Sequence, residues 1–140
     1  MSAPVRVLVH GASGRMGQTL LRLARERDDL QVVGAVSGSA PKQRVVEGVP
    51  HFGGRELAGA PAFDVAIDFS LPQGFDAILA LCERRGAALV SGTTGVSGAQ
   101  YDALNAAAAR IPVVWAGADS ATHRLWRLGP HRLGGPYGSG

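Results

Sequence analysis

The segment from Gly11 to Gly17 has the glycine spacing that suits a bound anion. It follows an apolar run and reads Gly11-Ala12-Ser13-Gly14-Arg15-Met16-Gly17. The first glycine of such a motif allows a tight turn, the second lets the backbone approach a ligand, and the third lets a helix pack against a strand. The free N–H groups and the positive dipole end of that helix then face the anion. The motif predicts a pyrophosphate site, and a structural turn without a ligand is the competing interpretation.

Residues after the second apolar run bear on which dinucleotide would bind. An acidic residue usually holds the adenosine ribose hydroxyls of NAD there, but this chain has Ser37 and Gly38 instead. Lys42 and Arg44 follow a few residues later, where they would suit the 2′-phosphate of NADPH. The alternative is that both are solvated loop charges. The expected cofactor is therefore NADPH or NADH. The missing acidic residue leaves the preference between them open, and the two cations favour NADPH.

Two further motifs follow later apolar runs and are expected at the same edge of the sheet. Phe69, Ser70 and Pro72 follow the third run, and Gly92 to Gly95 follow the fourth. Ligands bind beyond the carboxyl ends of parallel strands in such sheets. The small residues of Gly92-Thr93-Thr94-Gly95 would let a nicotinamide ring approach the backbone closely.

The titratable residues near these motifs do not form a catalytic or metal-binding group. Asp64 and Asp68 flank the third apolar run. Side chains alternate between the two faces of a strand, so these two would share a face but lie several ångströms apart. We expect Asp68 to bond the amides of the following turn rather than to act with Asp64. His10 ends the first run and is expected beside the phosphate turn. The other histidines lie without metal-ligand spacing, and they are His51, His123 and His131.

Alternating apolar runs and helical patterns must position these residues. Helical spacing of apolar residues is found from Arg15 to Arg27, after Pro72, and from Gln100 to Arg110. The segment Ser37–Gly59 is expected to be a loop with room for a brief helix or strand. The alternation predicts an α/β fold, a Rossmann-like doubly wound parallel sheet of about five strands with helices on both faces. The strands are expected at Val5–Val9, Leu30–Val36, Phe63–Phe69, Ala87–Ser91 and Ile111–Ala116.

The first two predicted helices each have an apolar face. In the first helix the apolar positions at helical spacing are Met16, Leu20, Leu23 and Ala24. In the second helix the buried face is expected to comprise Phe75, Ile78, Leu79 and Cys82. Cys82 is the only cysteine, so no internal disulfide forms, and we expect a buried, inert thiol.

Composition and charge exclude several functional classes. The chain has 140 residues, 46% of them hydrophobic, with no apolar stretch of membrane-spanning length and no signal-peptide layout. The isoelectric point is about 9.8, but residues 1–116 carry eleven basic and ten acidic side chains. Most of the excess positive charge lies in residues 117–140. Residues 1–116 contain no stripe of basic residues interleaved with aromatics, which a nucleic-acid-binding surface would show. We therefore expect a cytoplasmic protein that binds neither nucleic acid nor membranes.

Three motifs in order resemble those of bacterial 4-hydroxy-tetrahydrodipicolinate reductase, also called dihydrodipicolinate reductase. They are Gly11–Gly17, Asp68–Pro72 and Ser91–Gly95, within a resemblance running from about Val5 to Trp115. The resemblance implies a cytoplasmic oxidoreductase of lysine and diaminopimelate biosynthesis, which reduces 4-hydroxy-tetrahydrodipicolinate to tetrahydrodipicolinate with NADPH or NADH. It also implies that the glycine turn holds the pyrophosphate and that the Gly-Thr-Thr-Gly loop lies against the nicotinamide. The candidate cofactor-binding residues are Gly11, Ala12, Ser13, Gly14, Arg15, Met16, Gly17, Ser37, Phe69, Ser70, Gly92, Thr93 and Thr94.

The chain departs from the family after residue 116. The family continues with an Asn-Phe-Ser-type motif and a second domain that carries a His-His-x-x-Lys motif and a Gly-Thr pair and builds a tetramer. This chain reads Gly117-Ala118-Asp119-Ser120, has no adjacent histidines and has Lys42 as its only lysine. We therefore predict a truncated protein with a dinucleotide-binding domain at 1–116, an irregular basic tail at 117–140 and no catalytic residues. A small dicarboxylate substrate is expected only with the second domain, and the family tetramer is not expected.

The loss of periodicity after residue 116 suggests the hypothesis that residues from about Gly117 are read out of frame, or that the chain is otherwise truncated. A shifted frame near codon 117 that encodes no His-His-x-x-Lys downstream would disprove the readthrough. Three alternatives to a working reductase remain: a non-catalytic dinucleotide-binding module, a non-functional fragment, and another Rossmann dehydrogenase whose substrate domain is a separate chain. Loss of a returning C-terminal segment would also leave an exposed sheet edge.

Overall fold

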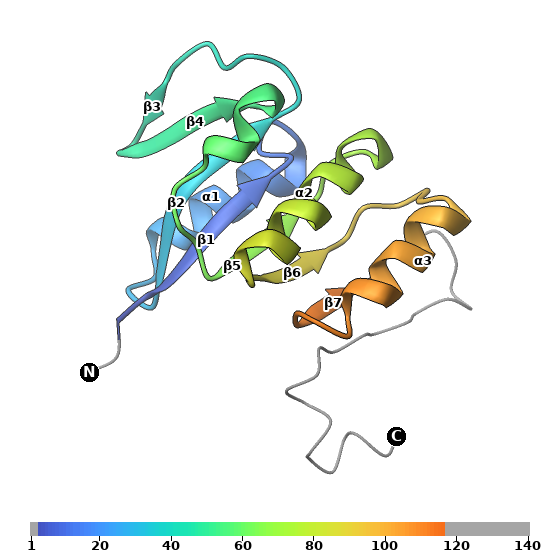
Figure 1. Ribbon diagram of the computed structural model, residues 1–140. Helices are drawn as coiled ribbons and strands as arrows, with labels where there is room; N and C mark the ends of the chain where they lie inside the picture. The colour runs from blue at the N-terminus through green and yellow to red at the C-terminus, as the bar shows by residue number, and fades with distance from the viewer. Residues whose placement is uncertain (1–2, 117–140) are drawn as a thin grey trace.

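A computed structural model describes residues 3–116, which form a single sheet with helices on both faces (Figure 1). Five strands lie where the sequence predicts them: β1 (Val5–His10), β2 (Leu30–Ser37), β5 (Val65–Asp68), β6 (Ala88–Ser91) and β7 (Val113–Trp115). All five are parallel and run in the spatial order β2-β1-β5-β6-β7. The chain reverses its direction of winding between β1 and β5. The predicted doubly wound, Rossmann-like α/β fold is therefore confirmed.

The segment predicted as a loop between residues 37 and 59 contains more regular structure than expected. It forms β3 (Val45–Val46), β4 (Val49–Gly53) and the short 3-10 helix η1 (Gly54–Gly59). β4 pairs in parallel with β2, and β3 pairs with β4 across a two-residue turn. Both turn residues, Glu47 and Gly48, have positive φ, as that hairpin turn requires. The sheet therefore has seven strands, because β4 satisfies backbone groups at the otherwise unpaired edge of β2.

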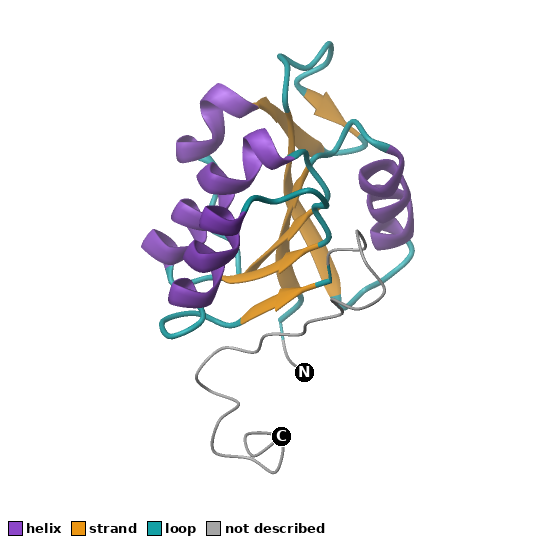
Figure 2. Ribbon diagram, turned by 90° about the vertical axis from the view of Figure 1, so that its right-hand side faces the viewer, coloured by secondary structure: helices purple, strands orange, loops and turns teal. Residues whose placement is uncertain are grey.

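The helices cover the two faces unequally. Figure 2 shows α1 (Arg15–Arg25) alone on one face, whereas α2 (Pro72–Arg85) and α3 (Gly98–Ala107) lie together on the other. The predicted buried face of α2 is confirmed, because its four expected side chains are at most 3% exposed. In α1, by contrast, Met16 is 48% and Leu23 is 50% exposed. The apolar side chains of α1 face the sheet only in part, and the described residues leave Met16 and Leu23 about half exposed.

Local signals explain where α2 and α3 begin and end. Pro72 occupies the first turn of α2, where its missing N–H costs no hydrogen bond. Gly86 ends the helix with a left-handed φ of 64°. Ser97 and Gln100 form a reciprocal capping box at the start of α3. Tyr101 of α3 then packs edge-on against Trp115 of β7, with ring centroids 5.6 Å apart.

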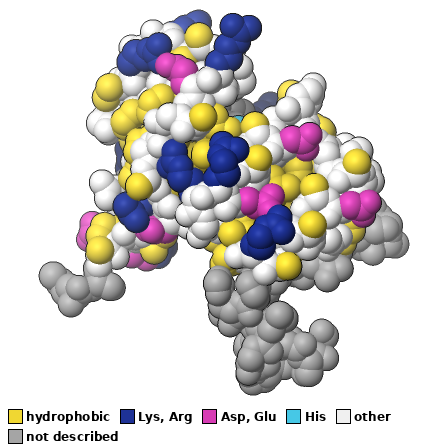
Figure 3. All heavy atoms as spheres, in the orientation of Figure 1, with side chains coloured by type: hydrophobic (Ala, Val, Ile, Leu, Met, Phe, Trp, Pro, Cys, Tyr) yellow, Lys and Arg dark blue, Asp and Glu magenta, His cyan; other side chains and the backbone are white. Residues whose placement is uncertain are grey.

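The surface seen in Figure 3 carries Lys and Arg side chains interspersed with Asp and Glu. None of the helices described is both long and apolar enough to cross a bilayer. Within residues 3–116, no three His, Cys, Asp or Glu side chains are grouped as metal ligands would be. Cys82 is fully buried, as predicted, and burial raises the pKa of its thiol to about 12. That thiol is therefore protonated at neutral pH and is not a nucleophile.

Candidate functional site

A hollow of about 710 Å³ lies beyond the carboxyl ends of β1, β2 and β5. This is the point at which the winding of the sheet reverses, where ligands of doubly wound proteins bind. Six of the thirteen candidate residues line the hollow: Gly11, Ser13, Gly14, Ser37, Phe69 and Ser70. The fold therefore brings the glycine turn, the end of β2 and the segment after β5 together around one space.

The glycine turn is shaped by close backbone contacts. A Cβ on Gly11 would lie 2.7 Å from the carbonyl carbon of Phe69, and the φ of Gly11 is 84°. A Cβ on Gly17 would lie 2.4 Å from the carbonyl oxygen of Gly11. A Cβ on Gly14 would meet only that same oxygen, at 3.6 Å. Gly11 and Gly17 therefore permit the turn and the close approach of α1, whereas Gly14 presents bare backbone to the hollow.

The start of α1 presents backbone donors. Gln18 is the first residue of the helix whose N–H returns to the turn, donating to the carbonyl of Gly14 at 2.9 Å. The N–H groups of Arg15, Met16 and Gly17 precede it and have no backbone acceptor among the described residues. Gly14 caps the helix without a side chain, and the first turn holds no acidic residue. These donors and the positive helix end can hold an anion.

A buried carboxylate joins the strand ends beside the hollow. Asp68 is fully buried, and its Oδ1 accepts hydrogen bonds from Nδ1 of His10 at 2.8 Å and the N–H of Ser70 at 3.1 Å. Its Oδ2 accepts from the hydroxyls of Ser91 at 2.8 Å and Thr93 at 2.6 Å. Burial alone would raise the pKa of Asp68, but the hydrogen bonds outweigh burial and lower it. One ionised side chain therefore holds the ends of β1, β5 and β6 in register.

The hydrogen bond to Asp68 also determines which ring nitrogen of His10 carries the shared proton. Because the carboxylate can only accept, Nδ1 of His10 carries the shared proton. His10 lines the hollow beside the glycine turn, as expected. Asp68 bonds the following turn, as expected, whereas Asp64 lies on the surface in an ion pair with Arg6. The two aspartates therefore do not act together.

Sequence reasoning missed the bonds from His10 and Ser91 to Asp68. Parallel pairing aligns His10 of β1 with Asp68 of β5, and Asp68 with Ser91 of β6. All three lie at or next to the carboxyl ends of separate apolar runs and are the last residues of β1, β5 and β6, and that shared position is the signal that could have linked them. The register between separate strands was needed to align them.

The loop after β6 lies next to the hollow without lining it. A Cβ on Gly92 would lie 2.3 Å from the ring of Phe69, so a glycine here makes room for that ring. Thr93 is buried, and its carbonyl accepts a hydrogen bond from Nε1 of Trp115 at 3.2 Å. Thr94 is exposed. Within this loop, Thr93 therefore has a structural role and Thr94 has the free side chain.

The remaining candidates in the glycine motif lie outside the lining of the hollow. Ala12 is buried under the turn, where its N–H donates to the carbonyl of Val36 at 2.9 Å. The side chains of Arg15 and Met16 are exposed at the start of α1. Arg44, a candidate phosphate ligand beside Lys42, instead forms an ion pair with Glu56, in which Nη1 donates to both carboxylate oxygens at 2.8 and 2.9 Å. Of the two candidate cations, Lys42 is therefore the one that takes part in no ion pair among the described residues.

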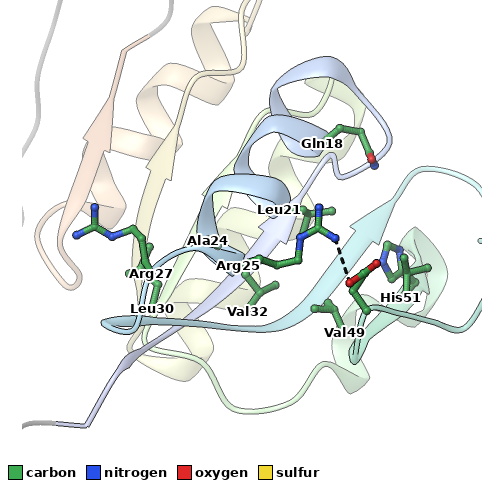
Figure 4. Close-up of a pocket in the computed structure, with 11 residues that line it drawn as sticks. Gln18, Leu21, Ala24, Arg25, Arg27, Leu30, Val32, Val49 and His51 are labelled. Atoms are coloured by element: carbon green, nitrogen blue, oxygen red, sulfur yellow. Dashed lines mark ion pairs between the residues drawn. The ribbon is translucent and has the colours of Figure 1, made fainter.

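A separate pocket of about 380 Å³ lies between α1 and the β2–β4 edge, away from the glycine turn (Figure 4). Its floor is apolar, with Leu21, Val32 and Val49, and an ion pair between Arg25 and Glu47 closes one side at 3.4 Å. None of the thirteen candidate residues lines it. This pocket marks the incomplete contact between α1 and the sheet.

Comparisons with known proteins agree with the fold and with the motifs. The family model for the N-terminus of dihydrodipicolinate reductase matches residues 5–118. The 4-hydroxy-tetrahydrodipicolinate reductase of Stenotrophomonas maltophilia is 70% identical over 114 residues, which is 81% of this chain and 48% of the relative. The enzyme of the same name from Xanthomonas campestris pv. campestris is 68% identical over 115 residues, which is 82% of this chain and 48% of the relative.

Solved structures share the fold at lower identity. A dipicolinate-bound dihydrodipicolinate reductase from Paenisporosarcina sp. TG-14 aligns with a TM-score of 0.65 and 21% identity, over 81% of this chain and 47% of that one. A 1-deoxy-D-xylulose 5-phosphate reductoisomerase from Zymomonas mobilis in complex with NADPH aligns with a TM-score of 0.60 and 17% identity, over 81% and 39%. The chain spans about half the length of the curated relatives it matches. By its sequence and fold, this chain belongs to the dihydrodipicolinate reductase family, of which it contains the N-terminal region.

Proposed function

We propose that this chain is the NADPH- or NADH-binding part of a 4-hydroxy-tetrahydrodipicolinate reductase. The observation that carries the proposal is the set of backbone donors at the start of α1, next to a hollow at the switch point of the sheet. In the whole protein, the nicotinamide would supply a hydride to 4-hydroxy-tetrahydrodipicolinate, giving tetrahydrodipicolinate. The share of this chain is to bind and orient the dinucleotide.

The thirteen candidate residues divide into three groups around the hollow. The turn from Gly11 to Gly17 would hold the pyrophosphate through backbone N–H groups, with Gly14 the point of closest approach. Ser37 would lie beside the adenosine ribose at the end of β2. Phe69 and Ser70 would border the nicotinamide end, together with the loop of Gly92, Thr93 and Thr94.

We assign no catalytic residue to residues 3–116. Both oxygens of Asp68 are occupied by internal hydrogen bonds, and the shared proton of His10 is held in one of them. Binding of the dicarboxylate and donation of a proton are therefore proposed for the second domain of the whole protein. Cytoplasmic location and the lack of a tetramer for this chain remain part of the same proposal.

The proposed dinucleotide-binding domain spans residues 1–116. Residues 117–140, for which an irregular basic tail and an out-of-frame origin are expected, lie outside the described residues.

Calorimetric titration of the full chain with NADPH and with NADH tests the proposal. We expect micromolar binding of at least one dinucleotide and negligible reduction of substrate. Gly14→Asp would place a carboxylate where the pyrophosphate approaches, and it should abolish binding without unfolding the chain, because a Cβ there meets only one atom at 3.6 Å. Gly98→Asp is the matched control, since it adds the same charge at the start of α3, where a Cβ meets nothing within 4 Å.

The outcomes separate the alternatives. Binding that survives Gly14→Asp would contradict the assigned pyrophosphate site. Absence of binding to either dinucleotide would favour a non-functional fragment. Ordinary enzymatic turnover by the chain alone would contradict the assignment of catalysis to a second domain.

A further inference from the structure

His10 is a histidine at the end of β1 whose ring lies at the wall of the dinucleotide hollow. The residue is 6% exposed, and its Nδ1 donates to Oδ1 of Asp68 at 2.8 Å. The other ring nitrogen, Nε2, has no hydrogen-bond partner among the described residues, and none of their unpaired side-chain nitrogens or oxygens is sealed from solvent. Because His10 lines the hollow, Nε2 is accessible from that side.

The hollow around this ring is basic. His10 and Arg55 are the titratable side chains among the described residues that line it, and no Asp or Glu is among them. Arg55, in η1, is exposed and takes part in no ion pair with a described residue. The hollow therefore holds one permanent cation and one histidine, which suits an anionic ligand.

The groups packed around His10 do not themselves change charge near neutral pH. Asp68 of β5 is the charged group bonded to the ring, and its hydrogen bonds lower its pKa, so it stays ionised. On α2, a Cβ at Gly74 would lie 3.1 Å from Cε1 of His10, so the helix places bare backbone against the ring. Cys82 of the same helix is protonated, because burial raises its pKa to about 12. The end of β2 contributes Ser37, which carries no charge.

A proton that binds to or leaves this ring does so at Nε2. Histidine is the side chain that ordinarily changes its charge between about pH 5 and pH 8. In either charge state the Nδ1 proton stays in the bond to Asp68, because the carboxylate only accepts. With Nε2 protonated, the ring is a cation directly before the glycine turn, which begins at the next residue. With Nε2 unprotonated, the pair has the net negative charge of Asp68.

We infer that His10 is a proton-dependent anchor for the diphosphate of the dinucleotide: the doubly protonated ring, held by Asp68, attracts the phosphates, and the neutral ring does not. The affinity for the dinucleotide therefore rises as the pH falls through the range in which His10 takes up its second proton. By linkage, the bound dinucleotide favours the protonated ring by the same factor. This inference rests on the proposed dinucleotide site and adds its dependence on pH.

Calorimetric titration of the full chain with NADH from about pH 8 to about pH 6 tests the inference. NADH is the probe because it lacks the 2′-phosphate of NADPH, and a phosphate monoester itself titrates in this range. We expect the affinity to increase about fivefold or more as the pH falls. Titrations at one pH in two buffers of different ionisation enthalpy should also show uptake of a fraction of a proton for each NADH bound.

His10→Asn removes the titrating ring and keeps an N–H donor near the place of Nδ1, so the bond to Asp68 can still form. Its affinity for NADH should be the same at both ends of the pH range, and its binding should take up no proton. His51→Asn is the matched control, because His51 is a half-buried histidine of β4 that does not line this hollow. It should keep the pH dependence of the natural chain. The proton uptake of the natural chain tests the inference even if His10→Asn does not fold.

The outcomes separate this inference from the proposed function. NADPH is titrated in parallel, and the difference between the natural chain and His10→Asn removes the contribution of its 2′-phosphate. Binding of neither dinucleotide at any pH would overturn both the site and the inference. Binding that does not strengthen at lower pH, or whose pH dependence persists in His10→Asn, would overturn the role of His10 and leave the dinucleotide site standing.

Discussion

At the scale of single residues, Asp68 is the side chain on which the site depends most. It is buried and ionised, and it accepts four hydrogen bonds: two from the ends of β1 and β6, one from the turn after β5 and one from the loop after β6. A buried charge is costly unless it is fully hydrogen-bonded, and here both oxygens are satisfied. Its hydrogen bonds thereby fix the positions of Ser70 and Thr93, which border the proposed nicotinamide end of the hollow.

Asp68→Asn should destabilise the fold. The amide keeps the shape, but its NH2 group would replace one of the two oxygens. It would then face either the donors of His10 and Ser70 or those of Ser91 and Thr93, so buried donors would be left facing each other. We expect a loss of about 3 kcal/mol in the free energy of unfolding, measured by urea denaturation. Asp64→Asn is the control, because that carboxylate is exposed in its pair with Arg6 and its loss should cost far less. Equal losses would contradict the role given to Asp68.

The same carboxylate predicts a dependence of stability on acid pH. The pKa of Asp68 is lower in the folded chain than its ordinary value of 3.8. Asp68 therefore contributes full stability above pH 3.8, and that contribution is lost as the pH falls through its lower, folded-state pKa. The difference in unfolding free energy between the natural chain and Asp68→Asn should narrow over that range, as urea titrations from pH 7 to about pH 2 would measure. A constant difference would show that Asp68 is not ionised in the fold.

At the scale of elements, the packing of α1 on the glycine turn shapes the proposed anion site. The helix begins close to the turn because Gly17 lets its backbone approach Gly11 and Ala12. This closeness orients the N–H groups of the first turn toward the hollow. The helix is otherwise lightly held, with Gly17 its only buried residue.

Gly17→Ala should therefore destabilise the fold, although a glycine-to-alanine change inside a helix usually stabilises it. Its Cβ would lie 2.4 Å from the carbonyl oxygen of Gly11 and 2.7 Å from Cα of Ala12, and both are backbone atoms that cannot rotate away. We expect about 2 kcal/mol of destabilisation and a loss of dinucleotide affinity. Gly98→Ala in α3 is the control, since a Cβ there meets nothing within 4 Å. Thermal unfolding of both variants checks this, and an unchanged midpoint for Gly17→Ala would contradict it.

At the scale of the whole molecule, the two faces of the sheet are unequal. α2, α3 and η1 cover one face, and the large core lies beneath them (Figure 2). On the other face, α1 leaves an apolar hollow of about 300 Å³, lined by Leu23 with Val7, Val9 and Ile67 among others. The two edge strands, β3 and β7, are only two and three residues long, which limits edge-to-edge pairing. We therefore expect any self-association to involve the apolar face of α1 rather than the sheet edges.

A charged substitution on that face should reduce association without harming the fold. Leu23 is 50% exposed, so Leu23→Glu should change the unfolding free energy by less than about 1 kcal/mol. It should also lower both binding of an apolar fluorescent dye and self-association in sedimentation experiments. Ala106→Glu adds the same charge at an exposed position of α3 and should leave both unchanged. Equal dye binding by the natural chain and Leu23→Glu would show that this face is not the apolar surface in question.

The local and periodic features of this protein could be read from its sequence. The glycine turn, the five parallel strands, the buried face of α2 and the inert thiol of Cys82 all follow from spacing within short segments. Spacing of this kind reports what a segment does by itself, which is why these predictions were confirmed. The strand pairing in the segment predicted as a loop was missed, because β4 gains its hydrogen bonds only from the edge of β2.

What only the tertiary structure decided is which distant residues meet. His10 reaches Asp68 across 58 residues of sequence, and Asp68 reaches Ser91 across 23, through the register of parallel strands. Arg44 is paired with Glu56, whereas Lys42 takes part in no ion pair among the described residues. Such pairings depend on how strands align in space, and no period in the sequence encodes that alignment. The sequence thus determined the dinucleotide fold and its glycine turn, whereas the tertiary structure decided which side chains hold the site and which remain free for a ligand.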